Sequence, residues 1–282
     1  MISTTKRLIK IIIKSLVKYM AGSSVGSYVL ELIHSYSMNF TQTIYHKHNT
    51  LIFSTPNQLN RDRVDSFSTK EPETLDWIDT IPAGSALWDV GANVGLYSCY
   101  AAKTRDLQVF AFEPSIFNLE FLARNIYLNQ LVDKVVKIPL PLSDSIKASR
   151  LNMTSTEWGA ALSSFGEDYG HDGKALNKVF EFSLVGLSMD ETVGLLKVPH
   201  PTHIKIDVDW IEHLILLGGQ SVLNQIKEVL VEVNDDFHHS LTSVNNYLSA
   251  AGLSLKWKRH AAMYDSSEHF GKVYNQLWHR IK

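Results

Sequence analysis

The chain has 282 residues, a formal net charge of −2 at pH 7, 45% hydrophobic residues and 20% charged residues. This size and composition indicate a globular protein of one large domain, or of one domain with an appendage, that can bury a sizeable core. The balanced charge excludes the strongly basic surface of a typical nucleic-acid-binding protein. Cys99 is the single cysteine, which excludes an intrachain disulfide and a zinc ribbon and is typical of a reducing compartment such as the cytoplasm.

Residues 4–20 are predicted to form a basic amphipathic helix. Apolar residues such as Ile12 and Leu16 share one side, and the other side carries lysines spaced four positions apart, a spacing that drifts little around a helix of 3.6 residues per turn: Lys6, Lys10, Lys14 and Lys18. These lysines interrupt the segment before the roughly 20 apolar residues that a membrane-spanning helix needs. The apolar core is also too short and too charged for a signal peptide.

Two interpretations of this helix remain open. It lies on the anionic inner face of a membrane, which would make a cytoplasmic protein peripheral to that membrane, or it docks its apolar side on its own domain or on a partner. Residues 1–80 as a whole are predicted to be an appendage, with this helix followed by a cap region beside the main sheet. In the cap, residues 41–53 favour one or two strands, residues 57–67 indicate a polar loop, and Pro72 suits the first turn of a helix.

From residue 81 to residue 282, the sequence predicts the main domain. Apolar runs that indicate buried strands alternate with helical segments, and these runs lie at residues 86–90, 107–112, 135–142, 203–208 and 229–233. This alternation is typical of parallel crossovers and predicts an α/β fold. Residues 253–257 and 272–278 are predicted to form an antiparallel pair of strands at the edge of the sheet. An insert at about residues 145–185 interrupts the alternation, and its apolar stretches are predicted to pair as an antiparallel arm.

The stretch from Ala86 to Tyr100 has the pattern of a buried strand, a tight glycine turn and the start of a helix. Gly91 allows a sharp turn where a side chain would clash, and Gly95 allows the helix to lie close to the strand. Asp89 places a charge near the carboxyl end of the strand. In an open α/β sheet this edge is where ligands bind, so we expect a ligand site here.

Acidic residues end the first three strands and predict the groups that this site would bind. Glu113 can accept two hydrogen bonds from a ribose diol. Asp144 is predicted to accept the exocyclic amine of an adenine, and Asp89 is predicted to face an ammonium group directly or through water. Asn93, with the backbone amides of Val94 and Gly95, is predicted to bind a carboxylate. Together, these groups describe S-adenosyl-L-methionine.

A dinucleotide is the rival ligand. Its pyrophosphate requires a Gly-x-Gly-x-x-Gly turn. The turn here contains only Gly91 and Gly95, and the neighbouring Asp89 would repel a pyrophosphate. The pattern therefore favours S-adenosyl-L-methionine over a dehydrogenase cofactor.

Over roughly residues 70–233, the chain resembles the FkbM-type S-adenosylmethionine-dependent methyltransferases. The matching segments are Trp88–Ser98, Phe112–Ser115 with Asn118, Leu122 and Asn125, Leu142–Asp144, Ile204–Val208 and Val229–Val233. The resemblance implies a class I Rossmann-like fold, with a mostly parallel seven-stranded sheet and an antiparallel terminal strand. It implies cofactor contacts from Glu113 and Pro114, and transfer of a methyl group (EC 2.1.1 class) to a hydroxyl of a sugar, glycan or secondary metabolite.

The chain departs from this family at one place. The family usually continues after the segment Ile204–Val208 with Glu-Gly-x-Glu, whereas this chain has Asp209, Trp210, Ile211 and Glu212. Trp210 in place of the glycine is predicted to narrow the substrate side of the pocket or to supply a stacking wall. A lost activity is the alternative.

Methyl transfer from a sulfonium depends mainly on alignment of the reactants and exclusion of water, and a hydroxyl acceptor also benefits from a general base. Asp207 and Glu212 are the candidate catalytic residues because they lie near the end of the fourth strand and the start of its helix. A structural role for Glu212, as a stabilising charge in the first turn of that helix, is the alternative. His238 and His239 are alternative bases, whereas His203 lies before the strand and is predicted to be structural.

Two alternative functions remain open. Asp207 with Asn234 and Asp235 resembles the oxygen-ligand set of magnesium-dependent, catechol-type methyltransferases, although such residues commonly cap helices and the main prediction includes no metal. Trp210 and the N-terminal helix also fit a non-catalytic, membrane-associated binding protein that retains the fold. The sequence predicts a small-molecule or glycan substrate and no nucleic-acid partner, and it carries no signal for the oligomeric state.

Overall fold

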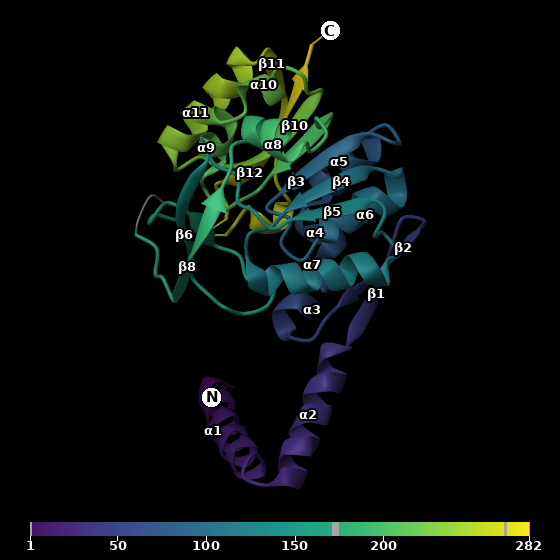
Figure 1. Cartoon of the computed structure of the whole chain (residues 1–282), viewed down its shortest axis with the longest axis vertical. Coiled ribbons are helices and arrows are strands. Elements are labelled where there is room, and N and C mark those ends of the chain that lie inside the picture. The colour runs from purple at the N-terminus through teal and green to yellow at the C-terminus, as the bar shows by residue number, and fades with distance from the viewer. Residues whose placement is uncertain (1, 171–174, 268–269, 282) are drawn as a thin grey trace.

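The computed structural model describes residues 2–170, 175–267 and 270–281. Its body is an α/β fold built on a seven-stranded sheet with the order β11-β12-β10-β9-β3-β4-β5 and with helices on both faces (Figure 1). The strands are β3 (Ala86–Val90), β4 (Gln108–Phe112), β5 (Val135–Ile138), β9 (His203–Ile206), β10 (Glu228–Asn234), β11 (Leu253–Arg259) and β12 (Val273–Arg280). Strands β3, β4, β5, β9 and β10 run parallel, and β12 runs antiparallel to both of its neighbours. The predicted Rossmann-like sheet is confirmed.

Both faces of the sheet are buried, which explains the near-continuous apolar strands. Trp88 of β3 packs into one core with the helices α8 (Met189–Leu196), α9 (Glu212–Leu217), α10 (Gln220–Leu223) and α11 (His238–Ala250). Leu87, the preceding residue, packs into a second core with α5 (Pro72–Thr80), α6 (Leu96–Arg105) and α7 (Ile116–Leu128). Successive residues of β3 therefore face opposite layers, as the strand period of two requires.

Three predicted elements differ from the structure. Strand β12 lies between β10 and β11, so the predicted antiparallel pair is present but only β11 is at the edge. The helix predicted over residues 211–223 is divided into α9 and α10 at Gly218, where a Cβ would come within 2.5 Å of the Ser143 carbonyl oxygen. The segment predicted as a loop contains α3 (Gln58–Asp65), whose polar residues give no apolar periodicity and whose start is capped by the Asn57 side chain.

The insert forms the predicted antiparallel arm. Strand β6 (Lys147–Met153) pairs with β8 (Phe180–Gly186) on one side and with the short β7 (Ser163–Phe165) on the other. In the cap region, β1 (Thr41–His46) and β2 (Asn49–Ser54) form a hairpin, and α4 (Phe67–Lys70) leads into α5. A short 3-10 helix, η1 (Ala262–Tyr264), lies between β11 and β12.

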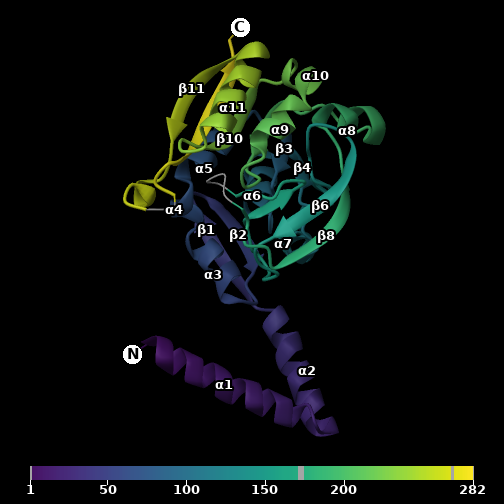
Figure 2. The same ribbon diagram turned by 90° about the vertical axis from the view of Figure 1, so that its left-hand side faces the viewer.

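Helices α1 (Ile2–Met20) and α2 (Ser24–Met38) form a V-shaped arm that projects from the body (Figures 1 and 2). The bend lies at residues 21–23, and the Ser23 side chain caps α2 by accepting a hydrogen bond from the Gly26 amide at 3.1 Å. At the base of the arm, Met38 packs against Val94 and Phe121 of the body. Among the described residues, no helix combines the length and apolarity that a bilayer crossing requires.

Candidate active site

A cavity of about 630 Å³ lies at the carboxyl ends of β3, β4, β9 and β10. Its size falls within the range of about 300–1,000 Å³ that is usual for small-molecule sites. Five residues predicted from the sequence line it: Gly91, Asn93, Glu113, Pro114 and Asp207. Residues of the cap region and of the insert complete the wall, so the cavity is shared by the three parts of the chain that surround the sheet edge.

Strand register places four of the lining residues in one row. Val90 of β3 pairs with Phe112 of β4 and with Ile206 of β9, and Ile206 pairs in turn with Val231 of β10. The next residue on each strand therefore stands at one level, in the order Glu232, Asp207, Gly91 and Glu113. At about 4.8 Å between neighbouring strands, this row spans about 14 Å.

Glycine is required in the middle of this row. Gly91 has a φ of +85°, and a Cβ there would lie 1.8 Å from the Asp207 carbonyl oxygen. Gly95 has a φ of +83°, and a Cβ there would lie 2.4 Å from Leu122 Cδ1 on α7. The first glycine thus permits the close approach of two strand ends. The second permits the close packing of α6 on α7, rather than the predicted packing of the helix on the strand.

Glu113 is held by the turn that follows β3. Its Oε2 accepts a hydrogen bond from the Asn93 amide at 2.8 Å, and its Oε1 accepts one from the Ser115 amide at 2.7 Å. A carboxylate can accept about four hydrogen bonds, so capacity remains for ligand hydroxyls. Burial raises the pKa of Glu113 to about 7, although the two amide hydrogen bonds favour its charged form.

The prediction that the backbone amides at the start of α6 bind the carboxylate of a ligand is wrong. The Val94 amide donates to the Asn93 side chain at 2.9 Å, and the Gly95 amide donates to the Ala92 carbonyl at 2.8 Å. Neither Val94 nor Gly95 lines the cavity. Both amides are therefore already satisfied within the turn.

Asp89 does not line the cavity, which corrects its predicted role as a ligand contact. It is 1% exposed, accepts a hydrogen bond from Ser98 Oγ at 2.5 Å, and stands opposite Lys205 in the register of β3 with β9. Burial raises the pKa of Asp89, and the Lys205 ammonium opposes that effect. The Lys205 ammonium thus acts on Asp89 through its charge, while it donates its hydrogen bond to Asp207.

Asp144 also lies outside the cavity lining, so its predicted contact with adenine is not supported. Its Oδ1 accepts hydrogen bonds from Lys147 Nζ at 2.7 Å and from Ser143 Oγ at 2.9 Å. The neighbouring wall consists instead of Leu140, Pro141 and Leu142. This wall is apolar and suits the face of a flat ring better than its polar edge.

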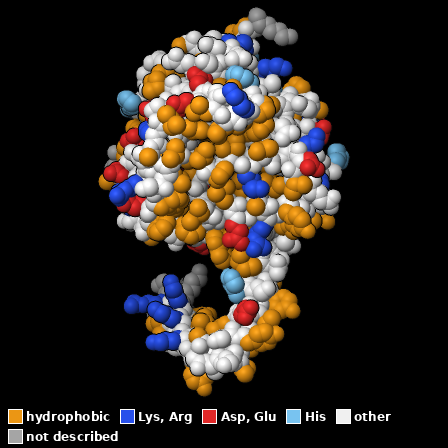
Figure 3. All heavy atoms as spheres, viewed as in Figure 1, with side chains coloured by type: hydrophobic (Ala, Val, Ile, Leu, Met, Phe, Trp, Pro, Cys, Tyr) orange, Lys and Arg blue, Asp and Glu red, His pale blue; other side chains and the backbone are white. Residues whose placement is uncertain are grey.

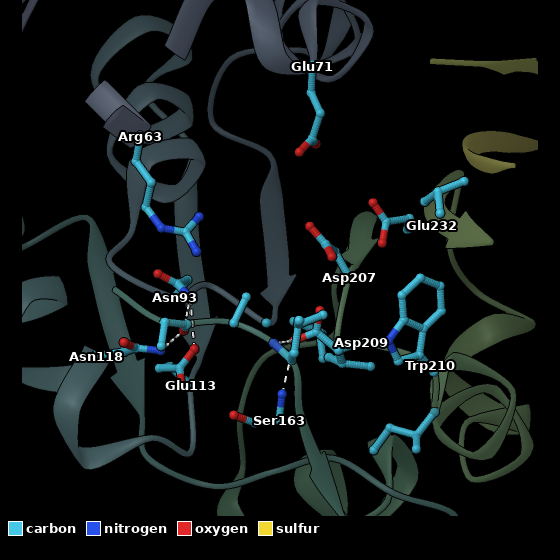
Figure 4. A pocket seen from close by; sticks show the side chains of 18 of the residues that line it. Arg63, Glu71, Asn93, Glu113, Asn118, Ser163, Asp207, Asp209, Trp210 and Glu232 are labelled. Carbon is cyan, nitrogen blue, oxygen red and sulfur yellow. Dashed lines mark hydrogen bonds between the residues drawn. The ribbon is translucent and has the colours of Figure 1, made fainter. Parts of the chain in front are cut away.

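Asp207 and Glu232 point into the cavity together with Glu71 of the cap region (Figure 4). Burial opposes ionisation of Asp207, but the ammonium of Lys205, 2.7 Å from Asp207 Oδ2, helps to hold its pKa below the usual value. Burial, followed by the Asp207 charge, raises the pKa of Glu232 well above the usual value. Environments that separate the pKa values of two neighbouring carboxyls are typical of acid–base sites, and here Asp207 is the charged member.

The predicted role of Glu212 as a catalytic base is corrected by its contacts. Glu212 is 3% exposed, and it lies outside the lining of the cavity. Its Oε1 accepts hydrogen bonds from the Trp210 amide at 3.0 Å and from the Val208 amide at 3.3 Å. Glu212 therefore holds the loop between β9 and α9. The alternative prediction from the sequence is a structural role, as a stabilising charge in the first turn of the helix, and the structure adds these hydrogen bonds to the loop.

Trp210 has a φ of +99°, in the region that favours glycine. It stands where the family resemblance leads us to expect glycine, and a bulky residue in such a conformation costs roughly 1–3 kcal/mol. The side chain is buried and lines the cavity beside Asp207 and Asp209 (Figure 4). The substitution therefore places an aromatic wall in the cavity, as predicted.

Residues 157–163 of the insert cross the cavity as a strap that polar side chains hold from several elements. Arg63 Nε of α3 donates to the Gly159 carbonyl at 2.8 Å, and Asp209 accepts a hydrogen bond from the Leu162 amide at 2.6 Å. The side-chain amides of Asn93 and Asn118 both donate to the Ala160 carbonyl, at 2.8 and 3.1 Å. Burial, aided by the charge of Asp207, raises the pKa of Asp209 to about 6.

The alternative metal site and the alternative bases are not brought to the cavity. Asp235 pairs with Lys258, and Asn234 accepts a hydrogen bond from the Asp236 amide at 3.0 Å, so neither side chain joins Asp207. In the part of the chain that the structure describes, no three His, Cys, Asp or Glu residues form a group suited to a metal ion.

The histidines proposed from the sequence also lie elsewhere. His238 and His239 are outside the cavity lining, and so is His203, whose pKa burial lowers to about 4. His203 Nδ1 lies 2.8 Å from Thr202 Oγ1, which agrees with a structural role. His260, which the sequence did not single out, does line the cavity and stacks on Tyr274 with ring centroids 4.2 Å apart.

Sequence reasoning missed several charged residues of the cavity, among them Arg63, Glu71 and Glu232. Glu232 carried a usable signal, because a glutamate inside an apolar strand is costly unless it has a role. Arg63 lies in the segment predicted as a loop, and Glu71 has the local pattern of a favourable charge near the start of a helix. Nothing in the local sequence indicates that either one reaches the sheet edge.

Comparison with known proteins gives a related sequence. The chain matches no family model. Over 154 residues it is 28% identical to the hexuronic acid methyltransferase AglP of Haloferax volcanii, a match that covers 52% of this chain and 55% of AglP. The chain thus matches about half the length of this curated relative.

Solved structures with a similar shape include two methyltransferases. Precorrin-6y C5,15-methyltransferase of Geobacter metallireducens aligns with a TM-score of 0.44 at 13% identity, over 74% of this chain and 87% of the other. TYW2 of M. jannaschii, solved in complex with AdoMet, aligns with a TM-score of 0.43 at 12% identity, over 86% of this chain and 87% of the other. These scores are low, and the assignment of the fold rests on the strand order described above.

Proposed function

We propose that this protein is an S-adenosylmethionine-dependent methyltransferase that methylates an oxygen of a sugar, with hexuronic acids as the first class to test. The observation that carries the proposal is the row Glu232, Asp207, Gly91 and Glu113 in one cavity. The row combines Glu113, a carboxylate that would bind a diol, with Gly91 and with the neighbouring acidic residues Asp207 and Glu232. The sequence similarity to a hexuronic acid methyltransferase supports the choice of acceptor.

The residues at the Glu113 end of the row fit the cofactor. Glu113 would accept hydrogen bonds from the ribose hydroxyls, and the apolar side chains of Leu140, Leu142 and Pro114 would contact the adenine. Arg63 points into the same cavity and would pair with the carboxylate of the methionine part (Figure 4). When bound, S-adenosylmethionine supplies an electrophilic methyl group on its sulfonium. Gly91 stands between the cofactor end and the acceptor end of the row, where the missing Cβ lets the Asp207 backbone approach the turn after β3.

The residues at the other end of the row fit an acceptor hydroxyl. Asp207 stays charged beside Lys205, so it would accept a hydrogen bond from the hydroxyl and take its proton as the new C–O bond forms and the bond between the methyl carbon and sulfur breaks. Burial and the Asp207 charge raise the pKa of Glu232 and favour its protonated form, which would donate a hydrogen bond to a neighbouring oxygen of the sugar. Trp210 would form an apolar wall for the sugar ring, and the strap over the cavity would exclude water.

The test is methyl transfer by the full chain to a panel of hexoses, hexuronic acids and their glycosides, followed by mass spectrometry. We expect one added methyl group on at least one uronic acid and none on the matching neutral hexose. Mild alkali would remove a methyl ester but leave a methyl ether, which identifies the oxygen that is methylated. Calorimetry with S-adenosylmethionine is the second arm, and no binding by the wild-type chain would refute the proposal.

A further inference from the structure

The arm formed by α1 and α2 presents an apolar surface that no other part of the described chain covers. On α1, Ile12 is 57% exposed, Leu16 is 54% exposed and Tyr19 is 83% exposed. Side chains of this kind are normally buried in a folded protein. An exposed apolar surface of this extent marks an interaction site.

Most of the exposed apolar side chains of α1 lie on one side of the helix. At about 100° per residue, Leu8, Ile9, Ile12, Ile13, Leu16 and Tyr19 fall within an arc of about 140°. The basic residues Arg7, Lys10, Lys14 and Lys18 fall within an adjoining arc of about 80°. Figure 3 shows these basic side chains together on the arm, next to apolar ones. One side of the helix is thus apolar, and the other carries the basic residues together with Ile11 and Val17.

The charges of the chain are divided between the arm and the body. Residues 2–38 contain five of the 27 lysines and arginines but only one of the 29 acidic residues, Glu31. The remaining residues therefore carry an excess of six acidic residues. The near-neutral total conceals a cationic arm on an acidic body. A partner for the arm should combine an apolar layer with negative charge.

The second helix supports the same kind of partner. Tyr28 of α2 is 60% exposed and Tyr36 is 71% exposed. Tyrosine is enriched where protein meets the boundary between lipid and water, because its ring is apolar and its hydroxyl is polar. Pairing of α1 with α1 of a second copy would instead bring two cationic helices together. The charge pattern therefore favours a bilayer over a second copy.

We propose that α1 lies in the surface of an anionic membrane, with its apolar side among the acyl chains and its basic residues at the lipid phosphates. At its base the arm packs on the body through Met38 and a ring contact of His34 with Trp158 at 6.5 Å between centroids. Figure 2 shows α1 joined to the end of α2 that lies farthest from the body, so a membrane in contact with α1 would lie apart from the acidic body. This proposal does not depend on the methyltransferase activity, because binding to lipid requires no cofactor or acceptor.

The experiment is flotation of the full-length chain with vesicles of phosphatidylcholine alone and with vesicles that also contain phosphatidylserine. We expect binding to the anionic vesicles, weak binding to the neutral ones, and release at high salt. Each lysine near an anionic surface contributes roughly fivefold to partitioning, so replacing Lys10, Lys14 and Lys18 with glutamine should lower it about 100-fold. The matched control replaces three exposed lysines of the body with glutamine, Lys137, Lys197 and Lys227, and should bind like the wild type.

A second variant tests the apolar side of the helix. Ile12→Gln with Leu16→Gln keeps good helix formers at exposed positions, so the body should fold normally and the protein should lose membrane binding. Light scattering without lipid tests the rival partner. If the wild type is a dimer that this variant converts to a monomer, the apolar side binds a second copy and the proposal is wrong. Equal flotation with neutral and anionic vesicles, or equal binding by the triple lysine variant, would also overturn it.

Discussion

Glu113→Gln is the change that tests the proposed cofactor site most directly. In the wild type, each carboxylate oxygen accepts one backbone amide, at 2.7 and 2.8 Å, and retains a lone pair for a ribose hydroxyl. In the variant one of these oxygens becomes an NH₂ group, which has no lone pair to offer. At least one charge-assisted hydrogen bond to the ligand is therefore lost. Such a bond is worth about 1.5–3 kcal/mol, which corresponds to an increase of roughly 10- to 150-fold in the Kd for S-adenosylmethionine.

The pH dependence of binding provides an independent readout of the same carboxyl. Burial raises the pKa of Glu113 to about 7, so about half of the empty protein carries the charge near neutrality. If ligand hydroxyls bind the charged form, the affinity should rise about tenfold between about pH 6 and about pH 8. Glu113→Gln should remove this rise, because the variant has no carboxyl to titrate.

Calorimetry at a series of pH values measures both quantities. Glu120→Gln is the matched control, since Glu120 lies on α7, is exposed and pairs only with Arg124 among the described contacts. It should leave the Kd within about twofold, as is usual for surface substitutions. A Kd for Glu113→Gln within twofold of the wild type, with the same pH dependence, would show that Glu113 does not bind the ribose.

Four further changes test other parts of the site. Arg63→Gln should raise the Kd for S-adenosylmethionine about 10- to 100-fold but leave that for methylthioadenosine, which lacks the carboxylate, unchanged in calorimetry. Asp207→Asn should lower kcat about 100- to 1,000-fold in the mass-spectrometric assay with little change in cofactor affinity, and an unchanged kcat would remove Asp207 as the base. Trp210→Gly should be more stable to denaturant than Trp210→Ala by about 1 kcal/mol, because alanine keeps the cost of the left-handed backbone. An alanine variant that is as stable as the glycine variant, or more stable, would contradict the φ of +99°. Burial raises the pKa of Glu212 from its ordinary value of 4.5 to about 7 in the folded state. The contribution of Glu212 to the free energy of unfolding should therefore fall by about 3 kcal/mol as the pH rises from 4.5 to about 7. Glu212→Gln should flatten the pH dependence of the free energy of unfolding over this range.

The fold followed from the sequence because its determinants are local. Apolar runs of strand length, glycine turns and the alternation of strands with helices each depend on a few adjacent residues, and all of the predicted strands of the main sheet are present. The position of β12 was not readable in this way. Insertion of a strand between β10 and β11 depends on pairing between residues far apart in the chain, such as Val229 with Trp278.

Contacts across long distances in sequence also explain what was missed in the site. The strap is held by Arg63, Asn93, Asn118 and Asp209, which lie between 41 and 96 positions from their partners. Each of these side chains has an ordinary local explanation as a cap or a surface residue. Only the folded chain shows that they meet residues 157–163, so the sequence predicted the antiparallel arm of the insert but not the contacts of this segment with the cavity.

The difference between Asp89 and the acidic residues of the cavity shows what limited the prediction of the site. Glu113 and Asp207 are each the first residue after their strand, and the register places them level with Gly91. Asp89 lies two positions before Gly91, inside the sheet, where its neighbour across the register is Lys205. A shift of two residues keeps a side chain on the same face but moves it about 6.6 Å along the strand, from the ligand into the core. An acidic residue near a strand end therefore identifies a ligand contact only when the last residue of that strand is known, and sequence patterns alone leave that boundary uncertain by about two residues.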